Sequence, residues 1–232
     1  MSTTDPVWLD FLDFAALRNQ RYVYFRGHAD ATYELIPGIG RPDRTPPGGW
    51  SQAAERELLL SFKREARRYE PGLGFSDLAW IALAQHHGLP TRLLDWTTNP
   101  LTAAWYAVNA KDDADAVVHV IQVDPDDIFD EEDPARPMPG LFTGTTDPFL
   151  ARVPAVAARI TAQQGLFSVH CRPTTPWVPA ASGMIHDRFV IPGASKGFFR
   201  RALYQVGFER HRLMVDLDGL CSALGWAYIN NL

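Results

Sequence analysis

The chain has 232 residues, of which 46% are hydrophobic and 21% charged, enough apolar residues to build a core as one large domain or two small ones. Its net charge of −5 at pH 7 argues against binding nucleic acid or an anionic membrane through the whole surface. The N-terminus does not read as a signal peptide, and no stretch approaches the about 18 uncharged apolar residues of a membrane span. We therefore expect a cytoplasmic protein with no membrane partner.

The first half of the chain carries mainly helical patterns. Ser51 and Ser76 are suited to cap helices, Gly88 to end one and Pro100 to begin another after Thr98 or Asn99. The last of these helices is nearly uncharged, so we expect it to be buried. The predicted helices are 6–19, 52–69, 77–87 and 100–110, the predicted strands are 21–27 and 31–37, and Leu93 and Leu94 are expected in a short extended link.

Strands are expected to dominate the second half. Residues 115–123 form the clearest strand pattern, and residues 124–155 read as an irregular acidic and Pro-rich insertion. The remaining predicted elements are strands 166–171 and 186–191 and helices 194–206 and 218–229. Because helices cluster in the first half, before most of the strands, the order favours a single α+β domain over residues 1–232 with a mixed or mainly antiparallel sheet.

Residues 85–99 carry hydrogen-bonding or ionisable side chains at almost every second position, between two apolar helical patterns. Polar groups near a core are costly unless they are paired. The run is therefore either a buried polar network or the floor of a site. Within it, Arg92 and Asp95 could pair with each other, Trp96 suits the core or a pocket wall, and His86 suits a helix cap or a direct role in a site.

A second candidate segment is the strand that ends in Phe25-Arg26-Gly27. An arginine at a strand end can present its guanidinium to a carboxylate or phosphate, and Gly27 allows a turn or the close approach of a ligand. The anion for Arg26 is either a protein carboxylate such as Asp95 or a ligand. We expect Arg26 and Asp95 in one polar cluster, with Arg92 and His86 beside them.

Familiar metal and cofactor motifs are missing. The two cysteines, Cys171 and Cys221, lack the spacing of a zinc site. His86 and His87 are adjacent and point about 100° apart on a helix, so they cannot share one ion. The chain has no Walker A motif, no Gly-x-Gly-x-x-Gly and no Gly-x-Ser-x-Gly elbow. We expect no metal cofactor and no Ser-His-Asp hydrolase.

The chain resembles the FRG-domain proteins, a family named for a Phe/Tyr-Arg-Gly motif. The matching stretches are residues 24–27, 35–41, 57–63, 84–97, 163–168 and 216–220. This resemblance identifies the residues that matter better than it identifies their function. The ligand-binding candidates are Arg26, Gly27, Gln85, Thr91, Arg92, Asp95, Trp96, Gln164, Phe167 and Ser168.

The segment 163–170 is also similar to the second motif of the Arg–Ser–Glu ADP-ribosyltransferases, in which an Arg-bearing first strand holds the NAD phosphates. Ser168 and His170 are expected to share one strand face. The order Arg26, Ser168, Glu209 is compatible with that family. The chain departs from it at Glu209, which lies in Phe-Glu-Arg, without the family's Glu-x-Glu or Gln-x-Glu motif.

The leading hypothesis is an enzyme that binds a nucleotide phosphate, with NAD as substrate for ADP-ribosyl transfer or NAD cleavage. Its catalytic candidates are His86 and Glu209. Arg26 and Arg92 are expected to bind the pyrophosphate. Phe167 and Trp96 are expected to wall the nicotinamide.

Two alternatives belong to other classes. One is a non-catalytic module that senses a ligand or binds a partner, in which the polar run only organises the fold. The other, less favoured, is a nucleic-acid-processing protein that uses a basic face within residues 186–212. The basic residues of that face are Arg188, Lys196, Arg200, Arg201, Arg210 and Arg212.

Overall fold

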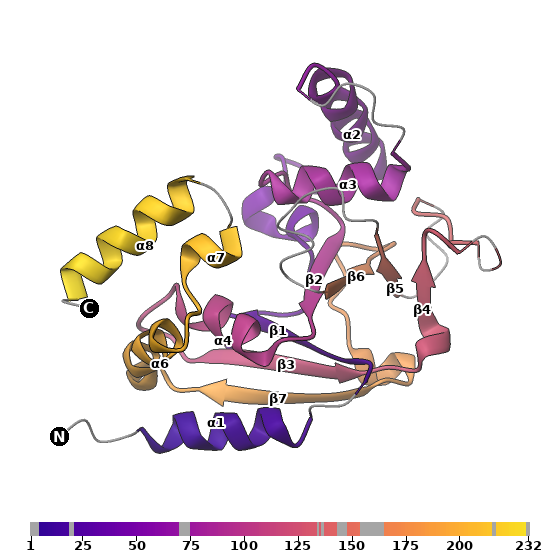
Figure 1. The fold of residues 1–232 in the computed structure, drawn as a ribbon. Helices are drawn as coiled ribbons and strands as arrows, with labels where there is room; N and C mark the ends of the chain where they lie inside the picture. The colour runs from indigo at the N-terminus through magenta and orange to yellow at the C-terminus, as the bar shows by residue number, and fades with distance from the viewer. Residues whose placement is uncertain are drawn as a thin grey trace.

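Figure 1 shows the computed structural model of the chain, which describes residues 5–18, 21–69, 75–133, 135, 137–142, 148–153, 165–214 and 217–230. The helices are α1 (Pro6–Ala16), α2 (Gln52–Ala66), α3 (Asp77–His86), α4 (Pro100–Val108), α6 (Gly193–Gln205), α7 (Arg210–Met214) and α8 (Leu217–Asn230). The strands are β1 (Val23–His28), β2 (Leu93–Thr97), β3 (Ala116–Gln122), β4 (Ile128–Asp130), β5 (Phe149–Arg152), β6 (Gly165–Val169) and β7 (Ile185–Ile191).

In the described part of the chain, the strands form one sheet in the order β4-β5-β6-β2-β1-β3-β7. β4 and β5 pair in parallel, and the other neighbours pair antiparallel. The predicted α+β fold with a mixed sheet is confirmed. The helices, however, are spread along the chain rather than clustered in the first half, since α6, α7 and α8 follow the last strand. None of the described helices is long and apolar enough to cross a membrane.

Helix boundaries follow the local capping signals. Ser51 Oγ accepts from the Ala54 backbone N–H at 3.2 Å, and Ser76 Oγ accepts from Ala79 N–H at 3.0 Å, as predicted. Asn99, rather than Thr98, caps α4, and its Oδ1 accepts from Leu101 N–H at 2.9 Å. Most of α4 is buried, as its uncharged sequence predicted.

Three expectations about strands were wrong. Residues 31–37 form turns and irregular chain, because Leu35 is buried as a single anchor rather than as part of a pairing strand. Leu93 and Leu94 begin β2, which pairs with β6. Residues 124–155 contain β4 and β5, which are too short for alternation to be visible in the sequence.

The sheet is not uniform at its centre. β1 pairs with β3 along its whole length but pairs with β2 at one position only, Phe25 opposite Thr97. Figure 1 shows β2 turning steeply away from β1 and β3, toward α3. The two strands part on the side that carries Arg26 and Asp95, so these side chains come from either edge of the gap.

Gly27 is required where β1 packs on α4. A Cβ at this position would lie 1.9 Å from the Ala103 carbonyl oxygen and 2.8 Å from the Ala107 nitrogen. Both are backbone atoms, so the strand and the helix would have to separate. The glycine of the Phe-Arg-Gly motif therefore allows two backbones to approach closely.

Gly27→Ala is expected to lower the free energy of unfolding by about 1–3 kcal/mol through this overpacking. Gly197→Ala is the matched control, because Gly197 lies in α6 with no atom within 4 Å of its added Cβ. That control should gain about 0.5–1 kcal/mol from helix propensity. Urea unfolding of both variants measures the difference, and similar values for the two would contradict the packing role of Gly27.

Candidate active site

A pocket of about 210 Å³ opens where β1 and β2 part, between α3 and α4. We call it the main pocket because it contains most of the predicted site residues; a larger hollow of about 770 Å³ along α1 and β1 contains none of them. The main pocket brings together segments that are far apart in the sequence: β1, the end of α3, β2, α4 and β6. Its predicted lining residues are Arg26, Gly27, Gln85, His86, Asp95, Trp96 and Phe167, and it is completed by Phe25, Ala82, Thr97, Thr102, Ala103 and Tyr106.

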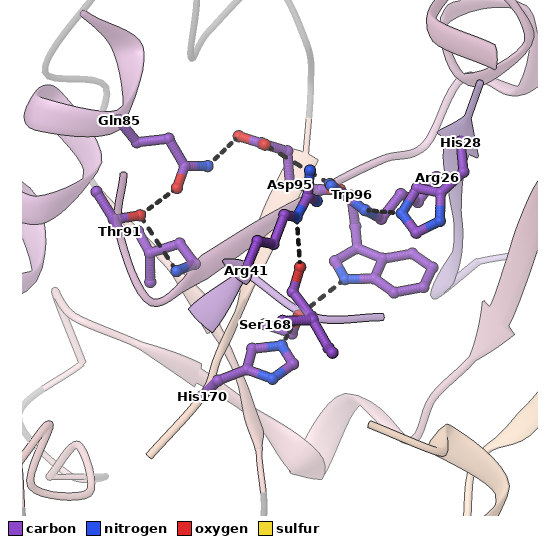
Figure 2. Close-up of polar contacts among 11 residues, drawn as sticks. Arg26, His28, Arg41, Gln85, Thr91, Asp95, Trp96, Ser168 and His170 are labelled. Atoms are coloured by element: carbon purple, nitrogen blue, oxygen red, sulfur yellow. Dashed lines mark hydrogen bonds and ion pairs between the residues drawn. The ribbon is translucent and has the colours of Figure 1, made fainter. Parts of the chain in front are cut away.

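Arg26 and Asp95 form the predicted polar cluster. Arg26 Nη1 donates to the Asp95 carbonyl oxygen at 2.7 Å and lies 3.6 Å from the Asp95 carboxylate (Figure 2). Arg26 Nε donates to His28 Nε2 at 3.1 Å. Burial lowers the pKa of Arg26 to about 10, so its guanidinium is charged at neutral pH. The protein itself therefore supplies the carboxylate that Arg26 needs, while 47% of the Asp95 side chain stays exposed.

Gln85 fixes the orientation of the Asp95 carboxylate. Its Nε2 donates to Asp95 Oδ1 at 2.8 Å, and its Oε1 accepts from the Thr91 hydroxyl (Figure 2). Thr91 is buried and does not line the main pocket, so it acts on the site through Gln85. His86, on the last turn of α3, lines the pocket and packs its ring edge-on against His87. The polar run is thus a hydrogen-bonded network with one side open to a pocket.

Arg92 is not part of this pocket. It is fully buried, and its Nε and Nη2 donate to the two carboxylate oxygens of Glu55, each at 2.6 Å. Nη1 donates to the Leu141 carbonyl oxygen, and the guanidinium lies 4.3 Å from the centre of the Phe142 ring. The predicted pairing with Asp95 is wrong, because Glu55 on α2 offers a bidentate partner. Each of its three nitrogens already donates a hydrogen bond within the protein, and Arg92 lines neither the main pocket nor the smaller pocket beside it.

Ser168 lies behind the pocket wall. Its hydroxyl accepts from the Trp96 indole N–H at 3.0 Å and lies 3.0 Å from His170 Nε2 (Figure 2). The expectation that Ser168 and His170 share one strand face is confirmed. Both are fully buried, and burial lowers the pKa of His170 to about 3. Ser168 therefore positions Trp96, which lines the pocket, rather than touching a ligand itself.

For two further predicted site residues, the structure does not place the side chain in the main pocket. Glu209 precedes α7 and does not line the main pocket. Gln164, like its neighbour Gln163, lies outside the described residues. The pocket nevertheless contains a carboxylate, Asp95, and a histidine, His86. Among the described residues, no group of three or more His, Cys, Asp or Glu side chains could hold a metal ion.

The basic face predicted within residues 186–212 is interrupted at Lys196. This side chain is fully buried, and its ammonium group donates to the carbonyl oxygens of Ala29, Ala110 and Lys111 at 2.8, 3.1 and 2.6 Å. Burial lowers its pKa. Arg200 pairs with Asp112 at 2.8 Å. Lys196 thus ties α6 to two loops instead of facing a nucleic acid.

Sequence reasoning missed the contribution of α4. Thr102, Ala103 and Tyr106 line the main pocket, and only the buried character of their helix was visible in the sequence. It also missed His28, which holds Arg26 Nε. These residues carry no motif, so no local signal distinguishes them from ordinary core positions.

Residues 21–116 match the family model of the FRG domain, which confirms the predicted resemblance for this segment. The segment contains β1, α2, α3, β2 and α4, and therefore all of the main pocket except Phe167. Neither the curated proteins nor the solved structures include a match to the chain. The resemblance of residues 163–168 and 216–220, of which Gln163, Gln164 and Asp216 lie outside the described residues, stays a prediction.

Proposed function

We propose that this chain, which contains an FRG domain, is an enzyme that binds a nucleotide-like ligand in the main pocket and, most concretely, transfers ADP-ribose from NAD or cleaves NAD. The observation that carries the proposal is the composition of the pocket. Aromatic side chains form its walls, and a carboxylate, a guanidinium, an amide and a histidine meet at its edge. Pockets of this composition suit a flat ring joined to a polar group.

The walls fit a single ring system. Phe25, Trp96, Tyr106 and Phe167 surround a volume of about 210 Å³, smaller than the about 300–1,000 Å³ of pockets that hold whole drug-sized ligands. The Trp96 indole is held by its hydrogen bond to Ser168. A nicotinamide or a nucleobase could stack on such a wall, with the remainder of the nucleotide outside the pocket.

The edge of the pocket suits the chemistry of a glycosidic bond. When the bond between C1′ of the ribose and nicotinamide breaks, its electron pair leaves with nicotinamide and positive charge develops on the sugar. The Asp95 carboxylate, oriented by Gln85 and Arg26, is placed to stabilise that charge. Water or an acceptor then bonds to C1′ and gives its proton to His86 as general base. In this proposal Asp95 takes the role that the sequence suggested for Glu209.

A non-catalytic binding module is the second candidate. It is favoured by the bonds that Arg26 and Gln85 already make to Asp95, since a network satisfied internally can be purely structural. In either case we propose that the protein works in the reducing cytoplasm, the location expected from its sequence.

His86→Ala is expected to lower the rate of NAD consumption by about 10²–10⁴-fold if His86 is the general base. His87→Ala is the matched control: it removes the neighbouring histidine, which is exposed and does not line the pocket, and should leave the rate unchanged. The rate is measured as nicotinamide release by the full chain.

Melting curves with NAD, ADP-ribose and nicotinamide separate the two candidates. Stabilisation by these compounds without turnover would leave the binding module. If none of these compounds stabilises the protein and NAD is not turned over, both candidates are contradicted.

A further inference from the structure

A second, smaller pocket lies next to the main pocket. It encloses about 170 Å³ and shares Arg26, Gln85 and Asp95 with the main pocket. Its own side is formed by the loop after β1, which contributes Arg41 and Arg44, and by the turn after α3. We call it the arginine pocket. A ligand that occupies both pockets must therefore pass the Arg26–Asp95 pair.

The two pockets differ in charge. In the main pocket, Arg26 faces Asp95, and the two formal charges compensate each other. The arginine pocket has the same pair plus Arg41 and Arg44, and no other acidic side chain is among its described lining residues. Asp43 acts on Arg41 from nearby but does not line the pocket. Positive charge is therefore in excess on one side of the pair only.

Arg41 is held in place and has donors to spare. Its Nε donates to the Ile36 carbonyl oxygen at 3.0 Å (Figure 2). Its Nη1 and Nη2 have no hydrogen-bond partner among the described residues. Burial, followed by repulsion from Arg44, lowers the pKa of Arg41. Arg41 also lies close enough to Arg26 to repel it. An anion between these guanidinium groups would relieve the repulsion and accept the unused donors.

The loop that carries Arg41 is fixed before any ligand arrives. Ile39 N–H donates to the Thr91 carbonyl oxygen at 3.0 Å, which ties the loop to the chain just before β2. A Cβ on Gly40 would lie 1.7 Å from the Pro173 carbonyl oxygen, so this glycine allows the loop to press against another backbone. A guanidinium supported in this way loses little freedom when it binds an anion.

We propose that the arginine pocket binds the phosphate or pyrophosphate of a nucleotide whose ring occupies the main pocket, with Arg41 and Arg44 as its ligand-binding residues. This inference rests on the proposed function, because it places the anionic part of the same ligand. It also replaces the role that the sequence suggested for Arg92. The ligand enters with its ring toward Trp96 and Phe167 and its phosphate toward Arg41.

Calorimetric titration of the full chain with matched pairs tests the inference: adenosine against ADP, and nicotinamide riboside against nicotinamide mononucleotide. Wild type is expected to bind the nucleotide of at least one pair 10-fold or more tightly than its nucleoside. In Arg41→Gln/Arg44→Gln this ratio should fall to within about 3-fold of unity, with the nucleoside affinity unchanged. Arg201→Gln, which removes an exposed arginine of α6, should keep the wild-type ratio.

The outcomes separate this inference from the function on which it rests. Nucleosides that bind as tightly as nucleotides to wild type would overturn the anion site and leave the ring-binding pocket. A double variant that keeps the full preference for nucleotides would do the same. If the protein binds none of the four compounds, both the anion site and the proposed function are overturned. If the double variant does not fold, Arg44→Gln alone, on an exposed side chain, is expected to lower the ratio 3-fold or more, and an unchanged ratio would count against the inference.

Discussion

Arg92→Ala is expected to lower the free energy of unfolding by about 3–5 kcal/mol, the largest effect of a single substitution that we predict. The change leaves the Glu55 carboxylate buried, and within the described part of the chain only the Trp50 indole N–H still donates to it, at 2.9 Å. It also removes the donor to the Leu141 carbonyl oxygen and the contact with Phe142. Urea unfolding at pH 7 measures the loss.

Two further variants show whether the buried charge is the cause. Arg92→Met/Glu55→Leu removes both partners and should recover much of the loss, because no uncompensated charge stays buried. Arg56→Ala removes the neighbouring exposed arginine, which also lies over the Phe142 ring, and should cost about 1 kcal/mol or less. If Arg92→Ala lowers the free energy of unfolding by less than about 1 kcal/mol and also weakens ligand binding, the structural role is contradicted and Arg92 belongs to the ligand site.

Acid is expected to destabilise the protein steeply, beginning near pH 6.5. Burial lowers the pKa of His28 to about 2 and those of His119 and His170 to about 3. In the unfolded chain these histidines titrate near pH 6.5. Their neutral forms therefore contribute stability that is fully present above pH 6.5 and is lost as the pH falls toward the folded values.

Each such histidine contributes a slope of about 1.4 kcal/mol per pH unit once the unfolded form is protonated, so the three together give up to about 4 kcal/mol per unit below pH 5.5. The free energy of unfolding, measured in urea at pH 7.5, 6.5, 5.5 and 4.5, tests this. Carboxylates add to the slope at the acid end, so variants are compared with wild type at the same pH.

His119→Phe should make the slope shallower by about one third, because it removes one of the three groups and keeps an aromatic ring beside His28 and His186. His87→Ala, which removes an exposed histidine instead of a buried one, is the matched control. Stability that stays flat between pH 6.5 and 5, or a slope unaffected by His119→Phe, would contradict the burial of neutral histidines.

The elements that the sequence predicted well are those with local causes. Helix starts at Ser51 and Ser76 depend on hydrogen bonds to residues three positions away, and β3 is a seven-residue strand rich in β-branched apolar residues. The strands that were missed, β2, β4 and β5, depend on partners across the sheet. Residues 31–37 show the opposite error: a strand was predicted where there is none, because their apolar side chains belong to a loop that packs on the core.

The candidate site shows the same division. That Arg26 and Asp95 lie together could be expected from the sequence, because both charges are hard to bury alone. The partner of Arg92, in contrast, was decided by the tertiary structure alone. Arg92 pairs with Glu55, 37 residues away in the sequence, and Arg26 pairs with Asp95, 69 residues away. Local sequence determines which groups must be paired, whereas long-range packing determines the pairs and, through them, which side chains stay open to a ligand.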